Sequence, residues 1–372
     1  MEEFQKDCPV NEILPSILPS VPLIYALGDL HGDYRLTRHI FLSLKLIDEK
    51  ETWIAPEGTV VVQVGDQLDG CRPEESAFCE DPATTPQDQV DLDVIDFFTR
   101  IAPKAREKGC HVISLLGNHE ILNALGEMGY VSAKSLAVPK KEFDPTKPID
   151  PKLTPKERRV KDFEPGGVRA KELACTRLAS VIIGSNLFVH GGILEGFLEK
   201  LKITDKDHFY LLNEVVRKWL LGRITHKYIA ALIQAEDSPF WTRVFGYLPP
   251  DMPADHEPCH KYLKPLVQTL EVGQIIVGHT PQPYLHKVGL NATCDEKVWR
   301  IDNGAGAVFS KFDSSKLQEE IKQSRQPAVL KITNDVEYEV LILDPTPLPS
   351  FLPSIEDKRE FDSEISLFTP RL

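Results

Sequence analysis

The sequence predicts an α/β fold with a buried sheet, and three patterns support this prediction. Five short apolar runs each end in glycine and polar residues, which is typical of buried strands. Helical patterns separate the early runs, and strands that alternate with helices indicate an α/β fold. Near the C-terminal end apolar and polar residues alternate, as they do in strands that close a sheet.

The five apolar runs give the expected strands in chain order. They are PLIYAL before GDLHG, TVVVQV before GDQLD, HVISLL before GNHE, NLFV before HGG, and QIIV before GHT. Towards the end, KVWRIDNGAGAVFS and AVLKITNDVEYEVLIL predict further strands and hairpins. We expect the turn of the last hairpin at Asn334 and Asp335, because these residue types adopt the backbone conformations of tight turns.

Two early helices are expected from apolar residues that recur at helical spacing. Their apolar positions are Leu36, Ile40, Leu44 and Ile47 in the first helix and Val94, Phe97, Phe98 and Ile101 in the second. Gly109 follows the second pattern and is a good helix stop.

The chain is expected to hold one catalytic domain, over residues 21–344. An extended lead-in, 1–20, precedes the domain, and a proline-rich tail, 345–372, follows it. Two insertions, 71–93 and 132–171, interrupt the strand and helix pattern and are expected to be loops. Loops of this length inside a compact domain are usually functional or disordered.

Composition and charge exclude several classes of protein. With 42% hydrophobic and 27% charged residues the chain is typical of globular proteins. A net charge of −13 repels nucleic acid and anionic membranes over most of the surface, so we expect neither as a partner. No apolar stretch reaches the roughly 18 residues of a membrane span, and MEEFQKDC does not resemble a signal peptide.

The seven cysteines contain no CxxC pair and are not expected to form a secreted disulfide framework. We therefore expect a soluble cytoplasmic protein. A pair between Cys71 and Cys79, in an oxidising setting or as a redox switch, is the less favoured alternative. The basic stretch around Arg158, Arg159 and Lys161 is expected to be a solvated loop, with a lid that attracts an anionic substrate as the alternative.

Polar side chains that can bind metal ions follow all five apolar runs. In open α/β sheets the ligand site lies outside the carboxyl ends of the strands, so we expect these side chains to meet at one edge. Carboxylate, amide and imidazole ligands together suit Mn, Fe or Zn. The residues are Asp29, His31, Asp66, Asp69, Asn118, His119, His190 and His279.

These residues offer more ligands than a single ion needs, and two ions that share a bridging carboxylate would use them. Such a pair can clamp the attacking and leaving oxygens of a displacement, with a metal-bound hydroxide as the nucleophile. Each motif alone is more often a structural turn or a helix cap. Five of them in this order, each after an apolar run, favour the metal site.

The ordered motifs GDLHG, GDQLD, GNHE, VHGG and GHT resemble those of the calcineurin-like metallophosphoesterases, in the phosphoprotein phosphatase branch. The resemblance runs from about Tyr25 to Asn303. The long spacer after GNHE, the PGG before VHGG, and SPFWTR are similar to the bacterial-type group called Shewanella-like protein phosphatases. The resemblance implies a β-sandwich flanked by helices, with a dimetal site on strand-end loops.

The resemblance also implies a role for each residue. His119 would be the general acid that protonates the leaving alkoxide, and Asp69 would orient it, which suits an imidazolium beside a carboxylate. Asp66 would bridge the two ions. The implied metal ligands are Asp29, His31, Asp66, Asn118, His190 and His279.

The second motif departs from the family pattern, because Gly70 replaces the arginine that normally grips the phosphate. A guanidinium suits bidentate phosphate binding, so another arginine is expected to take this role. Arg72, two residues further on, is the first candidate, with a solvated loop charge as the alternative. Arg243 in SPFWTR is the second, with a salt bridge under the site as the alternative.

The sequence therefore predicts a metal-dependent phosphoprotein phosphatase, with Ser/Thr substrates favoured over Tyr. Two divalent ions are the expected cofactors, Mn first and Fe or Zn as alternatives. The partner would be a phosphorylated protein or a small phosphate ester. A hydrolase of small molecules such as dinucleoside polyphosphates and a catalytically inactive binding relative remain as alternatives, and the oligomeric state stays open.

Overall fold

The computed structural model describes residues 2–73, 78–82, 90–137, 152–310 and 323–344. The predicted tail, 345–372, and parts of both predicted insertions lie outside the described residues. Within the described part, the strands form two six-stranded sheets.

The first sheet carries three of the predicted strands in parallel register, β2, β3 and β4. Its order is β12 (Glu337–Ile342), β11 (Ala328–Thr333), β2 (Leu23–Leu27), β3 (Thr59–Gln63), β4 (His111–Leu115) and β5 (Arg177–Leu178). The second sheet has β7 and β8 in parallel at its centre. Its order is β1 (Ile17–Leu18), β6 (Ser180–Ile183), β7 (Asn186–Val189), β8 (Gln274–Val277), β10 (Val298–Arg300) and β9 (Asn291–Thr293).

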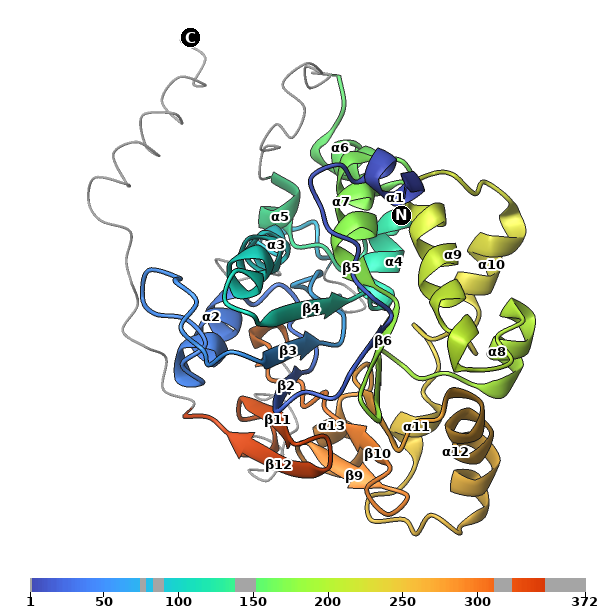
Figure 1. Ribbon diagram of the computed structural model, residues 1–372. Coiled ribbons are helices and arrows are strands. Elements are labelled where there is room, and N and C mark those ends of the chain that lie inside the picture. Colours follow the sequence, from blue (N-terminus) through green and yellow to red (C-terminus); the bar gives the residue numbers. More distant parts are fainter. Residues whose placement is uncertain (1, 74–77, 83–89, 138–151, 311–322, 345–372) are drawn as a thin grey trace.

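The two sheets pack face to face, because Ile24, Val60 and Ile113 of the first share a buried cluster with Phe188 and Ile276 of the second. Helices α2 (Tyr34–Ser43) and α3 (Leu92–Arg106) cover the other face of the first sheet, and the helices between residues 195 and 270 lie on the side of the second (Figure 1). The α/β prediction and the sandwich flanked by helices are thus confirmed. Burial on both faces also explains why the central strands are continuous apolar runs.

The last hairpin forms as predicted, with β11 antiparallel to β12. Asn334 and Asp335 turn the chain with φ of 51° and 73°, the left-handed conformation that a tight hairpin turn needs. The carboxylate of Asp335 accepts hydrogen bonds from the N–H of Ser185 and the amide of Asn186. This turn therefore ties the edge of one sheet to the other.

The two early helices form, although the first is shorter than expected. Asp33 caps α2 by accepting from the N–H of Leu36, and the helix ends at Ser43. Ile47 lies beyond it and forms an isolated bridge with Trp53. Its apolar side chain is buried all the same. The helical spacing therefore predicted correctly that Ile47 is buried, but not that it belongs to the helix.

The expectation of a loop over 132–171 is wrong for its described part. This part contains α5 (Ala133–Ala137), α6 (Pro155–Phe163) and the start of α7 (Val168–Thr176). Helix α6 begins with a capping box, in which Thr154 and Glu157 satisfy each other's backbone N–H groups. The prolines and charges that suggested a loop are in part helix-start signals.

The remaining helices lie mostly on the side of the second sheet. They are α1 (Glu2–Asp7), α4 (Asn118–Ala124), α8 (Glu195–Leu201), α9 (Tyr210–Leu220), α10 (Lys227–Gln234), α11 (Val244–Tyr247), α12 (Glu257–Leu270) and α13 (Gln282–His286). Helix α1 and strand β1 lie in the segment expected to be extended, where β1 pairs with β6. None of the described helices is both long and apolar enough to cross a membrane.

The expectation about the cysteines is wrong, because six of the seven form disulfides. The bonds are Cys8–Cys175, Cys71–Cys79 and Cys259–Cys294, and Cys110 is free and buried. The first and third join residues 167 and 35 positions apart, which only the fold brings together.

Candidate active site

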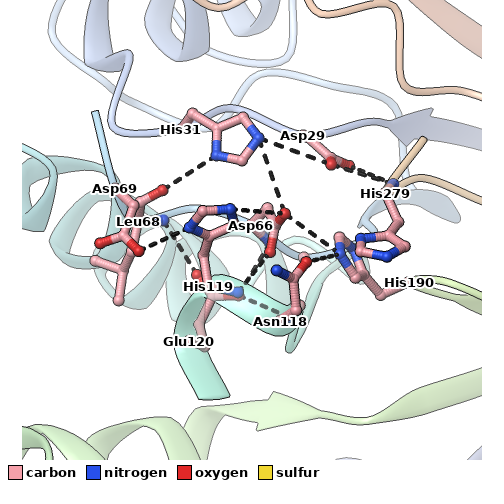
Figure 2. A network of polar contacts seen from close by, with 12 residues as sticks. Asp29, His31, Asp66, Leu68, Asp69, Asn118, His119, Glu120, His190 and His279 are labelled. Atoms are coloured by element: carbon pink, nitrogen blue, oxygen red, sulfur yellow. Dashed lines mark hydrogen bonds and ion pairs between the residues drawn. The ribbon is translucent and has the colours of Figure 1, made fainter. Parts of the chain in front are cut away.

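The structure brings the eight predicted strand-end residues together at one edge of the sandwich (Figure 2). The segments that follow β2, β3 and β4 supply six of them from the first sheet, and two of these six, Asn118 and His119, begin helix α4. His190 after β7 and His279 after β8 come from the second sheet. All eight side chains are buried. The site therefore spans the junction of the two sheets.

Asp66 lies at the centre of this cluster. Its Oδ2 is 3.8 Å from Nε2 of His31, 3.9 Å from Nε2 of His119 and 3.3 Å from Nε2 of His190. It belongs to both groups of side chains that could hold an ion, one with His31 and His119 and one with His190 and His279. A carboxylate shared by two such groups fits a bridging ligand.

The histidines each anchor one ring nitrogen and leave the other facing the cluster. Nδ1 of His31 is 3.3 Å from the carbonyl oxygen of Leu68, and Nδ1 of His190 is 2.9 Å from that of Val64. His279 uses Nε2 instead, 3.1 Å from the carbonyl oxygen of Trp241. Metal-binding histidines in proteins are oriented in this way, so the donor set fits divalent ions.

Burial sets the charge state of these imidazoles. It lowers the pKa of His31 and of His279 well below the ordinary range, which leaves both rings neutral, the form that binds metals. Burial also opposes the charged form of His190, but the carboxylates of Asp66 and Glu120 and the hydrogen bonds to Asp66 and Val64 together raise the pKa of His190. The imidazoles in turn hold the pKa of Asp66 well below its ordinary value against burial.

Asp29 and Asn118 complete the cluster at its two sides. The N–H of His279 donates to the carboxylate of Asp29, and the amide oxygen of Asn118 is 3.0 Å from Nε2 of His190. Burial and the neighbouring carboxyl group of Asp302 raise the pKa of Asp29 well above its ordinary value. Sequence reasoning missed Asp302, although it follows β10 in the same strand-end position as the other acids.

His119 and Asp69 form a buried pair. Nδ1 of His119 is 2.7 Å from Oδ2 of Asp69, and its Nε2 faces Asp66. The N–H of His119 donates to Oδ1 of Asp66, which fixes the backbone of the pair beside the cluster. An imidazole held between a carboxylate and the site can carry a proton to a bound group.

Glu120, the last residue of GNHE, is a structural residue that sequence reasoning left without a role. Its carboxylate accepts from the N–H groups of Gly117, Asp66, Gln67 and Leu68, at 2.7 to 3.1 Å. It thereby joins the loops after β3 and β4. Helix α4 begins at Asn118, so the motif is also a helix start.

The backbone around the cluster is unusual at four residues. His31, Asp66, Asp69 and His279 have φ of 47°, 55°, 71° and 66°. This left-handed region costs a non-glycine residue about 1 kcal/mol or more. Such residues persist where the surroundings hold them, and they cluster at functional sites.

Arg72 reaches the cluster instead of lying in solvent. Its Nη2 is 2.8 Å from Nε2 of His31, and its Nη1 donates to the carbonyl oxygens of Asp69 and Cys71. The guanidinium also lies 4.9 Å from the ring centre of Phe309. A cation thus lies inside the cluster.

Arg243 lies against the loop that carries His279. Its Nη1 donates to the carbonyl oxygen of His279 and lies 3.3 Å from the hydroxyl of Thr280. Within the described residues it therefore braces the GHT loop, and the alternative of a salt bridge under the site is not what the structure shows.

The expectation of a solvated basic loop is wrong for Arg159. This residue is 5% exposed and forms a bidentate ion pair with Asp91. Lys161 of the same helix is exposed. Arg159 is thus part of the protein interior, whereas Lys161 is not.

The chain is similar to known proteins over most of its length. Residues 22–283 match the family model of the calcineurin-like phosphoesterases. The chain belongs to this family. An uncharacterized protein of Acanthamoeba polyphaga mimivirus is 35% identical over 66% of the phosphoesterase chain and 97% of its own.

Two named relatives share much of the length of this phosphoesterase. Shewanella-like protein phosphatase 2 of Arabidopsis thaliana is 28% identical over 88% of the chain and 82% of its own. Shewanella-like protein phosphatase 1 of Plasmodium berghei is 26% identical over 76% of the chain and 66% of its own. The resemblance predicted from the motifs is therefore confirmed.

A solved structure has the same fold. The cold-active protein-tyrosine phosphatase of a psychrophilic Shewanella species covers 90% of the chain and 82% of its own, with a TM-score of 0.59 and 19% identity. The protein is a metallophosphoesterase, a hydrolase whose family uses divalent metal ions.

Proposed function

We propose that this phosphoesterase is a phosphoprotein phosphatase that prefers phosphoserine and phosphothreonine. The observation that carries the proposal is the buried His119–Asp69 pair beside Asp66. An alkoxide leaving group needs a proton more than a phenolate does, so a positioned acid favours Ser/Thr esters over Tyr esters. The protein substrate is supported by the two relatives named as protein phosphatases.

The proposed cofactors are two divalent ions, with Mn first and Fe or Zn suited to the same donors. The ions would supply the nucleophile, by lowering the pKa of water to near neutral, and would withdraw charge from the phosphate. In the proposal Asp66 is shared between the two ions. The proposed ligands are Asp29, His31 and Asp66 for one ion and Asp66, Asn118, His190 and His279 for the other.

The side chains of the protein would bind the phosphate and protonate the leaving group. Arg72 would bind the phosphate oxygens, since its guanidinium already lies beside His31. Arg243, which lies against the GHT loop, is the second proposed phosphate ligand. His119 would give its Nε2 proton to the leaving oxygen, and Asp69 would hold the ring in the orientation that this transfer needs.

The experiment measures hydrolysis with added Mn²⁺, as phosphate release from a phosphoserine peptide and a phosphotyrosine peptide and as formation of mononucleotides from a dinucleoside tetraphosphate. We expect the phosphoserine peptide to be the best substrate and His119→Asn to lower its kcat by about 10²-fold or more. Chelation should abolish activity, and Mn²⁺ should restore it.

The matched control is His208→Asn, because His208 forms the same kind of pair with Asp205 at 2.7 Å on the exposed surface. This variant should keep full activity. The dinucleotide as best substrate would instead indicate a small-molecule hydrolase. Failure of the wild-type protein to bind metal ions would indicate a binding relative.

The compartment is a separate proposal. The predicted cytoplasmic location rested in part on unpaired cysteines, whereas three disulfides favour an oxidising compartment, which we propose instead. Thiol labelling of the unreduced, denatured protein should modify Cys110 alone. Labelling of all seven cysteines in protein from its native source would restore the cytoplasmic prediction.

A further inference from the structure

Helix α6 carries Arg159 into the interior behind the His119–Asp69 pair. Nη1 and Nη2 of Arg159 lie 2.9 and 2.7 Å from the two carboxylate oxygens of Asp91. Its Nε donates to the amide oxygen of Asn123 at 2.8 Å. The guanidinium thus binds two different side chains through three of its nitrogens.

Both of these partners hold Asp69. The amide nitrogen of Asn123 donates to Oδ1 of Asp69 at 2.9 Å, and the N–H of Asp69 donates to Asp91 at 3.1 Å. The remaining oxygen of Asp69, Oδ2, is the one that binds His119. Arg159 itself is 3.9 Å from Oδ1 of Asp69. Besides His119, the Asp69 carboxyl group thus contacts Asn123, which Arg159 holds, and Arg159 itself, while its backbone N–H is held by Asp91.

The hydrogen bond from Arg159 also decides which way the Asn123 amide faces. An amide has an acceptor on one side and a donor on the other. Because Arg159 can only donate, the oxygen of Asn123 must face it, and the nitrogen must then face Asp69. A lysine could keep a charge near Asp91 but lacks the planar fork that binds both partners at once.

We propose that Arg159 is a positioning residue for the general acid: through Asn123 and Asp91 it fixes the Asp69 carboxyl group, and thereby the orientation of the His119 ring. This inference rests on the proposed function. It extends the catalytic machinery beyond the five strand-end motifs to helix α6, in the segment between GNHE and VHGG.

The test compares two phosphate esters that differ in their need for an acid. Phenyl phosphate has a poor leaving group, and 2,4-dinitrophenyl phosphate has a good one that leaves without a proton. In Arg159→Lys we expect kcat for phenyl phosphate to fall by about 10-fold or more, since misplacing a catalytic group is costly. The kcat for the dinitrophenyl ester should change by less than about twofold.

Controls separate positioning from general damage. Arg158→Lys changes the neighbouring arginine of the same helix and should leave both rates unchanged. Calorimetric titration with Mn²⁺ should give the same affinity for Arg159→Lys as for the wild-type protein. Arg159→Gln keeps a hydrogen-bond donor for Asn123 but removes the charge. If Arg159→Lys folds poorly, kcat on both esters can be measured with Arg159→Gln instead.

A variant that carries both Arg159→Lys and His119→Asn tests whether Arg159 acts through His119. If Arg159 acts through His119, Arg159→Lys should cause no further loss of kcat on phenyl phosphate in the His119→Asn background. Equal losses on both esters, or an additive loss in the double variant, would overturn the inference and leave the proposed function intact. A wild-type protein inactive on both esters would overturn both.

Discussion

Nη2 of Arg72 lies 2.8 Å from Nε2 of His31, which places a guanidinium inside the cluster of proposed metal ligands. If Arg72 binds the substrate phosphate, Arg72→Ala should raise KM for a phosphopeptide by about 10- to 10²-fold, the value of hydrogen bonds to a charged group. Arg100→Ala removes an arginine that pairs with Glu51 outside the site and should leave KM unchanged. Steady-state kinetics would check both, and a normal KM in Arg72→Ala would exclude this role.

The Cys71–Cys79 disulfide ends at the residue before Arg72. The carbonyl oxygen of Cys71 accepts a hydrogen bond from Arg72, so loss of the disulfide should loosen the guanidinium. Cys79→Ser is expected to raise KM by less than Arg72→Ala does, with little change in kcat. Cys259→Ser breaks a disulfide of α12 and serves as the control. Equal effects of the two serine variants would argue against a local role.

Gly117 lies directly against Asp66. A Cβ at this position would collide with Oδ1 and the backbone nitrogen of Asp66, whereas a Cβ on Gly129 would meet no heavy atom within 4 Å. Gly117→Ala should therefore displace Asp66 and weaken Mn²⁺ binding by about 10-fold or more, as changes next to metal ligands do. Calorimetry of both variants would test this, with Gly129→Ala expected to bind as the wild type does.

The Arg159–Asp91 pair should make stability depend on pH. Burial opposes ionisation of Asp91, but the charge and hydrogen bonds of Arg159 outweigh it and hold its pKa below the ordinary value of 3.8. Ionised Asp91 therefore stabilises the fold above that value, and this contribution is lost as the pH falls through the lower, folded-state pKa.

Asp91→Asn should accordingly lower the free energy of unfolding by about 3 kcal/mol near neutral pH, because one partner of a buried pair is lost. The difference from the wild-type protein should shrink in acid. Urea unfolding at a series of pH values would measure it. A difference that stays constant with pH would contradict the ion pair.

The sequence was most informative where ligand and strand are neighbours in the chain. Asp29 and His31 follow β2 directly, and His190 and His279 follow β7 and β8, so local patterns alone placed them at strand ends. Parallel strands then bring such ends to one edge. The sandwich, in contrast, came from family resemblance, because no local pattern states which sheet a strand joins.

What the sequence did not predict depends on contacts between distant segments. Arg159 and Asp91 are 68 positions apart, and Cys8 and Cys175 are 167 apart. A basic residue among other charges has the pattern of a solvated helix face, and only its partner shows that it is buried. Asp302 differs from these, since its place after β10 was visible in the chain.

The left-handed backbone at His31, Asp66, Asp69 and His279 has a consequence for evolution in the laboratory. Glycine adopts this conformation without steric cost, so a library selected only for heat resistance should accumulate glycine at these four positions. Each such change would delete a side chain of the site while relaxing the chain beneath it. These four residues are then retained only under selection for catalytic turnover. Directed evolution of this scaffold should therefore select for turnover in every round.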